Sequence, residues 1–180
     1  IREGWIAKKD MLSIQGRGRL AQLALAEELG IVDFPSPAGG CLLTDRNYCL
    51  RLRDLQKHHQ DNLHAIELLA YGRHFRLTNE AKLIIGRDEA ENETLRHIFQ
   101  QGIMLEAEDY TGPLGFITGK LNFETLDLAL SIFILYHPKA PIYSTIDVWR
   151  INDNKITGKM IKIATKGDRE IIKKHLISYL

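Results

Sequence analysis

From residue 73 onward, short apolar segments alternate with turn residues, and this pattern limits the fold more than any other feature of the chain. Segments 73–77 and 81–85 flank Thr78-Asn79-Glu80, which predicts a β-hairpin. The pattern continues, with strands predicted at 103–107, 115–118, 143–151 and 159–164 and helices at 88–101, 122–136 and 168–180. Hairpins interleaved with helices predict an α+β fold for this part of the chain.

The first third of the chain differs, because its apolar residues follow a helical spacing. Helices are predicted at 17–29, 45–58 and 61–71, and Gly30 and Gly72 end the first and the last of them. The change of pattern places a boundary near residues 58–72. We therefore expect residues 1–60 to form a helical piece and residues 61–180 to form the α+β domain.

Composition sets outer limits. The 180 residues, 44% of them hydrophobic, suffice for one substantial core or two small ones. The longest apolar run, 128–136, is too short to span a bilayer, and two cysteines suit a reducing compartment. Because the start also lacks a signal-type apolar stretch, we expect a cytoplasmic protein without a membrane partner, and a piece of a longer chain.

Charge is balanced overall but unevenly distributed. The 24 Lys and Arg residues nearly equal the 23 Asp and Glu residues, so the total says nothing about nucleic acid. Residues 88–109 carry seven acids and one base, whereas residues 155–174 carry seven bases and two acids. The second segment could form a basic face on a neutral protein, and an ordinary solvated helix surface is the alternative.

One cysteine, Cys41, lies in an unusual loop that begins Pro35-Ser-Pro-Ala. Gly39 and Gly40 free the backbone just before the sulfur, and Asp45 offers a capping oxygen to the next helix. A helix N-terminus favours the thiolate, which is the reactive form, so Cys41 is a candidate nucleophile or sulfur carrier. The alternative is a small buried side chain, which is how most free cysteines behave.

Basic residues of the first hairpin form a candidate RNA-contacting surface. Strand alternation puts Arg73 and Phe75 on one face, and His74 and Arg76 on the other; Arg87 follows the second strand. Arg and His beside an aromatic ring suit phosphate contacts and base stacking. A half-exposed edge hairpin with solvated charges is the alternative.

The remaining motifs are weaker. Cys49 is expected to pack in the core, and a resolving partner for Cys41 is the alternative. His58, His59 and His64 lack the convergent ligand set of a zinc site, so no metal site is predicted. The sequence also contains no phosphate-binding glycine loop and no serine-hydrolase or zinc-protease motif.

These segments carry two family resemblances. Four of them resemble the end of the PP-loop α/β domain in tRNA 2-thiouridylase and 4-thiouridine synthase-like proteins: Leu12–Arg17, Leu23–Gly30, Pro35–Asp45 and Arg51–Leu55. Two others, Gly72–Leu77 and Ile85–Asn92, resemble the NFACT-type RNA-binding domain appended to such proteins. The combined resemblance implies the helical end of a PP-loop domain over residues 1–60, followed by an NFACT-type domain over residues 61–180.

The PP-loop resemblance implies a specific chemistry. Enzymes of that family adenylate a uridine oxygen with ATP and replace it with sulfur carried by a cysteine, here Cys41 in the loop supported by Gly39, Gly40 and Asp45. The PP-loop motif Ser-Gly-Gly-x-Asp-Ser is absent from this chain, so we expect no cofactor here and ATP only in the full-length protein. The implied partners are tRNA and a sulfur-donor protein.

The RNA-binding residues that we predict are Arg51, Arg73, His74, Arg76 and Arg87. The function we predict is therefore the C-terminal portion of a tRNA sulfur-transfer protein. A non-catalytic RNA-binding module with a structural cysteine is one alternative. A protein–protein adaptor, with residues 88–109 and 155–174 as its charged faces, is another.

Overall fold

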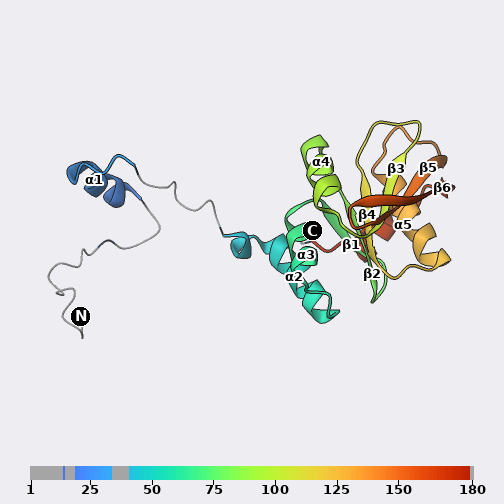
Figure 1. The fold of residues 1–180 in the computed structure, drawn as a ribbon, viewed down its shortest axis with the longest axis horizontal. Helices are drawn as coiled ribbons and strands as arrows, with labels where there is room; N and C mark the ends of the chain where they lie inside the picture. The colour runs from blue at the N-terminus through green and yellow to red at the C-terminus, as the bar shows by residue number, and fades with distance from the viewer. Residues whose placement is uncertain (1–13, 15–18, 34–40, 179–180) are drawn as a thin grey trace. The chain divides into compact units, whose positions relative to one another are not determined.

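The computed structural model describes residues 14, 19–33 and 41–178 (Figure 1). The chain divides into two compact units, Ile1–Gly39 and Gly40–Leu180. In the first unit, α1 (Leu20–Glu28) forms within the predicted helix and buries none of its side chains. Gly30 follows it with φ of 68°, the left-handed conformation that ends helices.

The second unit is built on one six-stranded antiparallel sheet with the order β1-β2-β4-β3-β5-β6. Its strands are β1 (Arg73–Arg76), β2 (Ala81–Ile85), β3 (Gly102–Ala107), β4 (Gly115–Gly119), β5 (Tyr143–Asn152) and β6 (Lys155–Thr165). The pairing confirms the predicted hairpins, and the architecture confirms a mixed α+β fold.

Helices cover both faces of this sheet. On one face, α5 (Phe123–Leu135) and α6 (Arg169–His175) pack in a cluster that includes Phe75, Ile117 and Phe133. On the other face, a second cluster that includes Leu95 and Phe116 joins α4 (Glu89–Ile98) and the 3₁₀ turn η3 (Leu68–Ala70) to the sheet. The first hairpin is therefore not half-exposed: every residue of β2 is buried.

The longest helix, α5, is apolar on most of its surface because it lies on the sheet. Six of its 13 residues are buried. Its start is fixed by Asn122, whose side-chain oxygen accepts hydrogen bonds from the Thr125 amide at 2.8 Å and the Thr125 hydroxyl at 2.7 Å. The predicted cap at Asn122 is therefore confirmed.

Four elements precede the sheet in the described part of the second unit, namely η2 (Leu42–Thr44), α2 (Arg46–Lys57), α3 (Leu63–Glu67) and η3. The predicted 61–71 helix is shorter than expected. After α3 the chain forms the 3₁₀ turn η3, and Gly72 adopts a φ of 74°, which a helix does not allow. The second unit begins at Gly40 and so contains both α2 and the sheet. The domain boundary predicted at residue 60 would place α2 and the sheet in different domains. Among the described residues, no helix is long and apolar enough to cross a bilayer.

The β5–β6 hairpin is tighter and longer than the sequence pattern predicts. Asp153 and Asn154 both adopt positive φ, 48° and 59°, as the two-residue turns that favour hairpins require. Strand β6 therefore starts at Lys155 rather than at Lys159. A register shift follows, because Arg150 pairs with Gly158 while Ile151 pairs with Ile156, which leaves Thr157 as the extra residue of a bulge.

Candidate nucleic-acid interface

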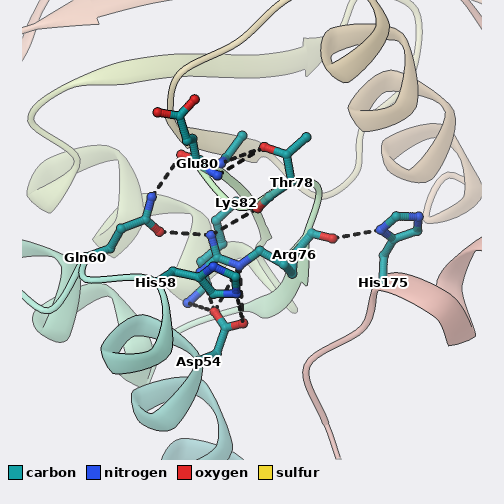
Figure 2. A network of polar contacts seen from close by, with 9 residues as sticks. Asp54, His58, Gln60, Arg76, Thr78, Glu80, Lys82 and His175 are labelled. Carbon is teal, nitrogen blue, oxygen red and sulfur yellow. Dashed lines mark hydrogen bonds and ion pairs between the residues drawn. The ribbon is translucent and has the colours of Figure 1, made fainter.

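Arg76, a predicted RNA contact, is held inside the molecule by α2. Its Nε lies 3.2 Å from both carboxylate oxygens of Asp54, its Nη2 forms an ion pair with the same carboxylate, and its Nη1 donates to Gln60 at 2.9 Å (Figure 2). Both charged side chains are 14% exposed. The guanidinium thus has its hydrogen bonds within the protein, and its arrangement is that of a structural ion pair.

The same carboxylate serves a buried lysine. Lys82, directly across the hairpin from Arg76, is 2% exposed, and its Nζ lies 4.0 Å from Asp54 Oδ2. The pKa of Lys82 is lowered to about 7, chiefly by burial; Asp54 opposes the shift, and the positive charges of Arg76 and Arg51 add to it. His58 also approaches Asp54, with its Nε2 at 3.8 Å. One carboxylate therefore faces three basic groups (Figure 2).

His74 and Arg51 lie deeper than a surface for RNA would require. His74 is fully buried, and its Nε2 donates to the Tyr71 carbonyl at 2.7 Å. Burial, and after it the charges of Lys82 and Arg51, hold the pKa of His74 well below its usual value. Arg51 is 9% exposed and donates to the Leu69 carbonyl at 2.8 Å. Both side chains support the packing of α2 and η3 against β1.

Arg73 and Arg87 keep more contact with solvent but also have internal partners. Arg73 donates to the Gly86 carbonyl at 3.4 Å, and its guanidinium lies 5.2 Å from the centre of the Tyr136 ring. Arg87 is paired with Glu91, whose carboxylate also accepts the Gly72 amide at 3.1 Å. The hydrogen bond to Glu91 raises the pKa of Arg87 above its usual value. The five predicted RNA-binding residues thus have partners within the protein on both faces of the sheet and do not form one open surface.

The cysteine loop is described from Cys41 onward, and Gly39 and Gly40 lie outside the described residues. Cys41 is exposed and begins η2. Asp45 Oδ1 accepts the Tyr48 amide at 2.7 Å, so the predicted cap of the following helix is confirmed. Cys49 is a separate free thiol that donates to the Leu43 carbonyl at 3.1 Å. Cys41 therefore offers an accessible sulfur next to a capped helix.

A hollow of about 800 Å³ on the described surface is lined by more acidic than basic side chains, the basic ones being Arg87 and Arg96. It lies between the start of α4, the end of β3 and the loop that leads to β4, and its acidic lining consists of Asp88, Glu89, Glu93, Glu106, Glu108 and Asp109. Such a lining repels phosphate groups. Within the described part of the chain, no group of three or more His, Cys, Asp or Glu side chains could hold a metal ion.

In the described part of the chain, basic residues that form no ion pair lie on β5 and β6, outside the set of RNA-binding residues predicted from the sequence. Arg150 and Lys155 are exposed, and the Nζ of Lys162 lies 4.8 Å from the centre of the Phe123 ring. Lys159 differs, because its Nζ forms an ion pair with Asp147 at 2.9 Å and lies 4.4 Å from the Trp149 ring centre. The signal in the sequence was the basic segment 155–174, but its lysines could not be assigned to a face without the register of the hairpin.

The fold and this distribution of charge define a class of protein: an α+β module with an acidic hollow and a basic edge strand. The family model described as "NFACT protein RNA binding domain" matches residues 72–176, which is more than half of the chain and takes in all six strands with α4, α5 and α6. The chain belongs to this family and carries an RNA-binding domain. The match does not reach the segments that resemble a PP-loop domain, so that resemblance stays a prediction.

Among solved structures, this chain has a similarity to the C-terminal part of the fibronectin/fibrinogen-binding protein from Streptococcus suis. The two share 13% sequence identity, the alignment covers 73% of this chain and 68% of that one, and the TM-score is 0.49. No curated protein matches this chain.

Proposed function

We propose that residues 40–180 bind tRNA as a module that performs no chemistry on the RNA by itself. The observation that supports this function is the family match, which extends from the first strand of the sheet to its last helix. The arrangement of charge is compatible with it, because basic side chains free of ion pairs accompany one edge strand while the acidic hollow lies elsewhere. The choice of tRNA among RNAs rests on the resemblance of the preceding residues to tRNA thiouridylases.

The direct test is equilibrium binding of the full chain to a labelled tRNA over a series of salt concentrations. Each phosphate contact should contribute about −0.7 to −0.9 to the slope of log affinity against log salt. We expect binding in low salt with a clearly negative slope, and weaker binding to a DNA duplex of equal length. Absence of binding in low salt, or an affinity that does not change with salt, would refute the proposal.

A second candidate function is sulfur transfer through Cys41. The observation that favours it is the exposure of Cys41 as a free thiol beside α2. In this proposal the Cys41 thiolate attacks the outer sulfur of a persulfide on the sulfur-donor protein, which forms a persulfide on Cys41 and releases the donor's cysteine as a thiolate. That sulfur is then available for thiouridine formation, which needs groups beyond this chain. We assign no ATP-dependent step to the residues of this chain.

The test of this second candidate compares Cys41→Ser with Cys49→Ser in the full-length protein. If Cys41 carries sulfur, Cys41→Ser should abolish thiouridine in cellular tRNA without changing tRNA affinity, while Cys49→Ser should leave both unchanged. Normal thiouridine levels in the Cys41→Ser strain would remove Cys41 from the chemistry and leave RNA binding as the whole function of the module.

A further inference from the structure

The two edges of the sheet are not equivalent. At the β1 edge, Leu176 forms a bridge with Phe75, and the Ile177 amide donates to the His74 carbonyl at 2.8 Å, so the C-terminal residues occupy that edge. At the other edge, β6 pairs only with β5 among the described residues, and ten of its 11 residues are not buried. An extended ligand can therefore reach the sheet along β6.

The register assigns the side chains of this hairpin to two faces. Residues opposite each other in an antiparallel pair share a face. Ile146 and Val148 pack in the cluster that contains α5, so their partners Lys162 and Met160 lie on the α5 side. Arg150 follows Val148 by two positions and lies on the same side.

Lys155 joins the same face across the bulge. Its partner Asn152 follows Arg150 by two positions, which places both on the α5 side. The α5 side of β5 and β6 therefore presents three bases, Arg150, Lys155 and Lys162, of which none has an ion pair within the described residues. Gly158, opposite Arg150, leaves the space above the strand open.

The opposite face of the hairpin has another character. It presents Ile161 and Ile163, which are 58% and 75% exposed, and its lysine, Lys159, is neutralised by the ion pair with Asp147. Positive charge is thus concentrated on the α5 side. From Lys155 to Gly167 the sequence contains no acidic residue, so β6 itself adds no repulsion against a polyanion.

The basic face also carries an exposed aromatic ring. Phe123, the first residue of α5, is 66% exposed, and the Lys162 ammonium lies over its ring. Met160, which is 44% exposed, lies next to Lys162 on the same face of β6. Cations that can contact phosphates beside an exposed aromatic ring suit the binding of unpaired bases, which can stack on the ring, whereas the bases of a duplex cannot reach such a ring.

We propose that single-stranded RNA binds along the α5 side of β6, with phosphates on Arg150, Lys155 and Lys162 and an unpaired base against Phe123. This inference rests on the RNA-binding function proposed above and gives it a location and a preferred form of RNA. Unpaired loops and ends supply such a strand in a folded RNA. The lysines of β6 would also oppose the pairing of two β6 edges, which favours RNA over a second copy of the chain.

The test compares two doubly substituted full chains of equal charge. Lys155→Ala/Lys162→Ala removes two cations from the proposed site. Arg53→Ala/Lys57→Ala is the matched control, because both residues are exposed on α2 and their side chains form no hydrogen bond or ion pair within the described structure. Binding of a labelled 12-nucleotide RNA, single-stranded or annealed to its complement, is measured over a salt series, and thermal melting verifies the fold of each variant.

We expect the β6 variant to bind single-stranded RNA about tenfold more weakly at 150 mM salt, with a salt slope smaller in magnitude by about 1.4. The α2 variant should stay within about twofold of the unsubstituted chain, as expected for charges that make no contact. Phe123→Ala should lower the affinity for the single strand about tenfold through lost stacking, and should leave duplex affinity and salt slope unchanged.

The outcomes separate the location from the function. If the unsubstituted chain binds no RNA, the RNA-binding function itself fails. If it binds but the α2 variant loses affinity while the β6 variant does not, or if both lose the same amount, RNA binding stands and the β6 site is wrong. Crosslinking of a 5-iodouridine RNA provides a readout without substitutions: crosslinks outside residues 120–125 and 148–164 would also overturn the proposed site.

Discussion

Asp54 is the residue on which the packing of α2 against the first hairpin depends. Its carboxylate contacts Arg76, lies 4.0 Å from the Lys82 ammonium and lies 3.8 Å from His58. Burying a charge is costly unless the charge is paired, and here the two basic side chains of Arg76 and Lys82 share the one carboxylate of Asp54. The cluster therefore has more positive than negative charge. The group whose charged form is destabilised is Lys82, whose pKa is lowered to about 7.

The first prediction concerns Asp54→Asn. This change leaves Arg76 and Lys82 buried without a counter-charge, which should lower the free energy of unfolding by about 3–5 kcal/mol. Urea denaturation at pH 7 measures the loss. Asp61→Asn is the control, since Asp61 is exposed, and it should change stability by less than about 0.5 kcal/mol. An equal, small effect of both changes would show that Asp54 is dispensable.

The second prediction is a pH dependence caused by Lys82. Its pKa is about 7 in the folded chain and 10.5 as a model value, so between these limits the unfolded chain binds more protons at this site. The cost of burying the ammonium is therefore fully present below pH 7 and is relieved as the pH rises toward 10.5. A shift of this size corresponds to roughly 5 kcal/mol.

Lys82→Met tests this dependence, because Met keeps the apolar stem and Asp54 keeps Arg76 as its partner. We expect the variant to be more stable than the parent at pH 6.5, by roughly 2–4 kcal/mol, and the gain to shrink by pH 9.5. Urea denaturation at pH 6.5 and pH 9.5 gives the difference in unfolding free energy between the variant and the parent. Groups that titrate in the same way in both chains do not contribute to this difference. If the gain in stability is the same at both pH values, the pH dependence does not come from Lys82.

These residue-scale features explain why the burial and the partners of the predicted RNA-contacting residues could not be predicted from the hairpin sequence. The pattern Arg73-His-Phe-Arg76 correctly predicted a strand, but Asp54 lies 22 residues before Arg76, and no local signal indicates which carboxylate will reach it. His74 was expected on a face open to solvent and is fully buried, because α2 and η3 cover that face.

At the scale of elements, the capping residues in the sequence predicted where four of the helices begin. Asp45, Asp88, Asn122 and Asp168 each accept a backbone amide at the start of a helix, and the structure begins α2, α4, α5 and α6 directly after them. Other boundaries differ from the prediction. The helix predicted over 168–180 ends at His175, because Leu176 forms a bridge with Phe75 of β1. Strand β6 also differs. Its alternation is interrupted by Gly158 and by the bulge at Thr157, so the sequence pattern indicated a strand only from Lys159. The two-residue turn at Asp153 and Asn154 starts the strand earlier.

The third prediction concerns the cap of α5. Asn122→Ala removes the acceptor for the amide and hydroxyl of Thr125, a residue that is 5% exposed. We expect a loss of about 1–2 kcal/mol in the free energy of unfolding. Asn122→Ser preserves a capping oxygen and should recover most of that loss. If Asn122→Ser is as destabilised as Asn122→Ala, the effect comes from packing rather than from the cap.

At the scale of the whole molecule, both core clusters lie within Gly40–Leu180. The fourth prediction is that a chain of residues 40–180 folds without residues 1–39, because every buried cluster residue between Leu68 and Ala164 remains. Thermal unfolding of this chain should be a single transition within a few degrees of that of the full chain. A broad transition, or a large fall in melting temperature, would show that residues 1–39 contribute to the core.

The occupation of the β1 edge by the C-terminal residues has a consequence for self-association. A sheet that can be extended at one edge alone accepts a single neighbour, so edge-to-edge association of this unit ends at a closed pair. Propagation into a fibre requires a second open edge in each chain. The hydrogen bond from Ile177 to His74 and the bridge at Leu176 therefore prevent a further chain from pairing with β1. Deletion of the last five residues would expose the β1 edge.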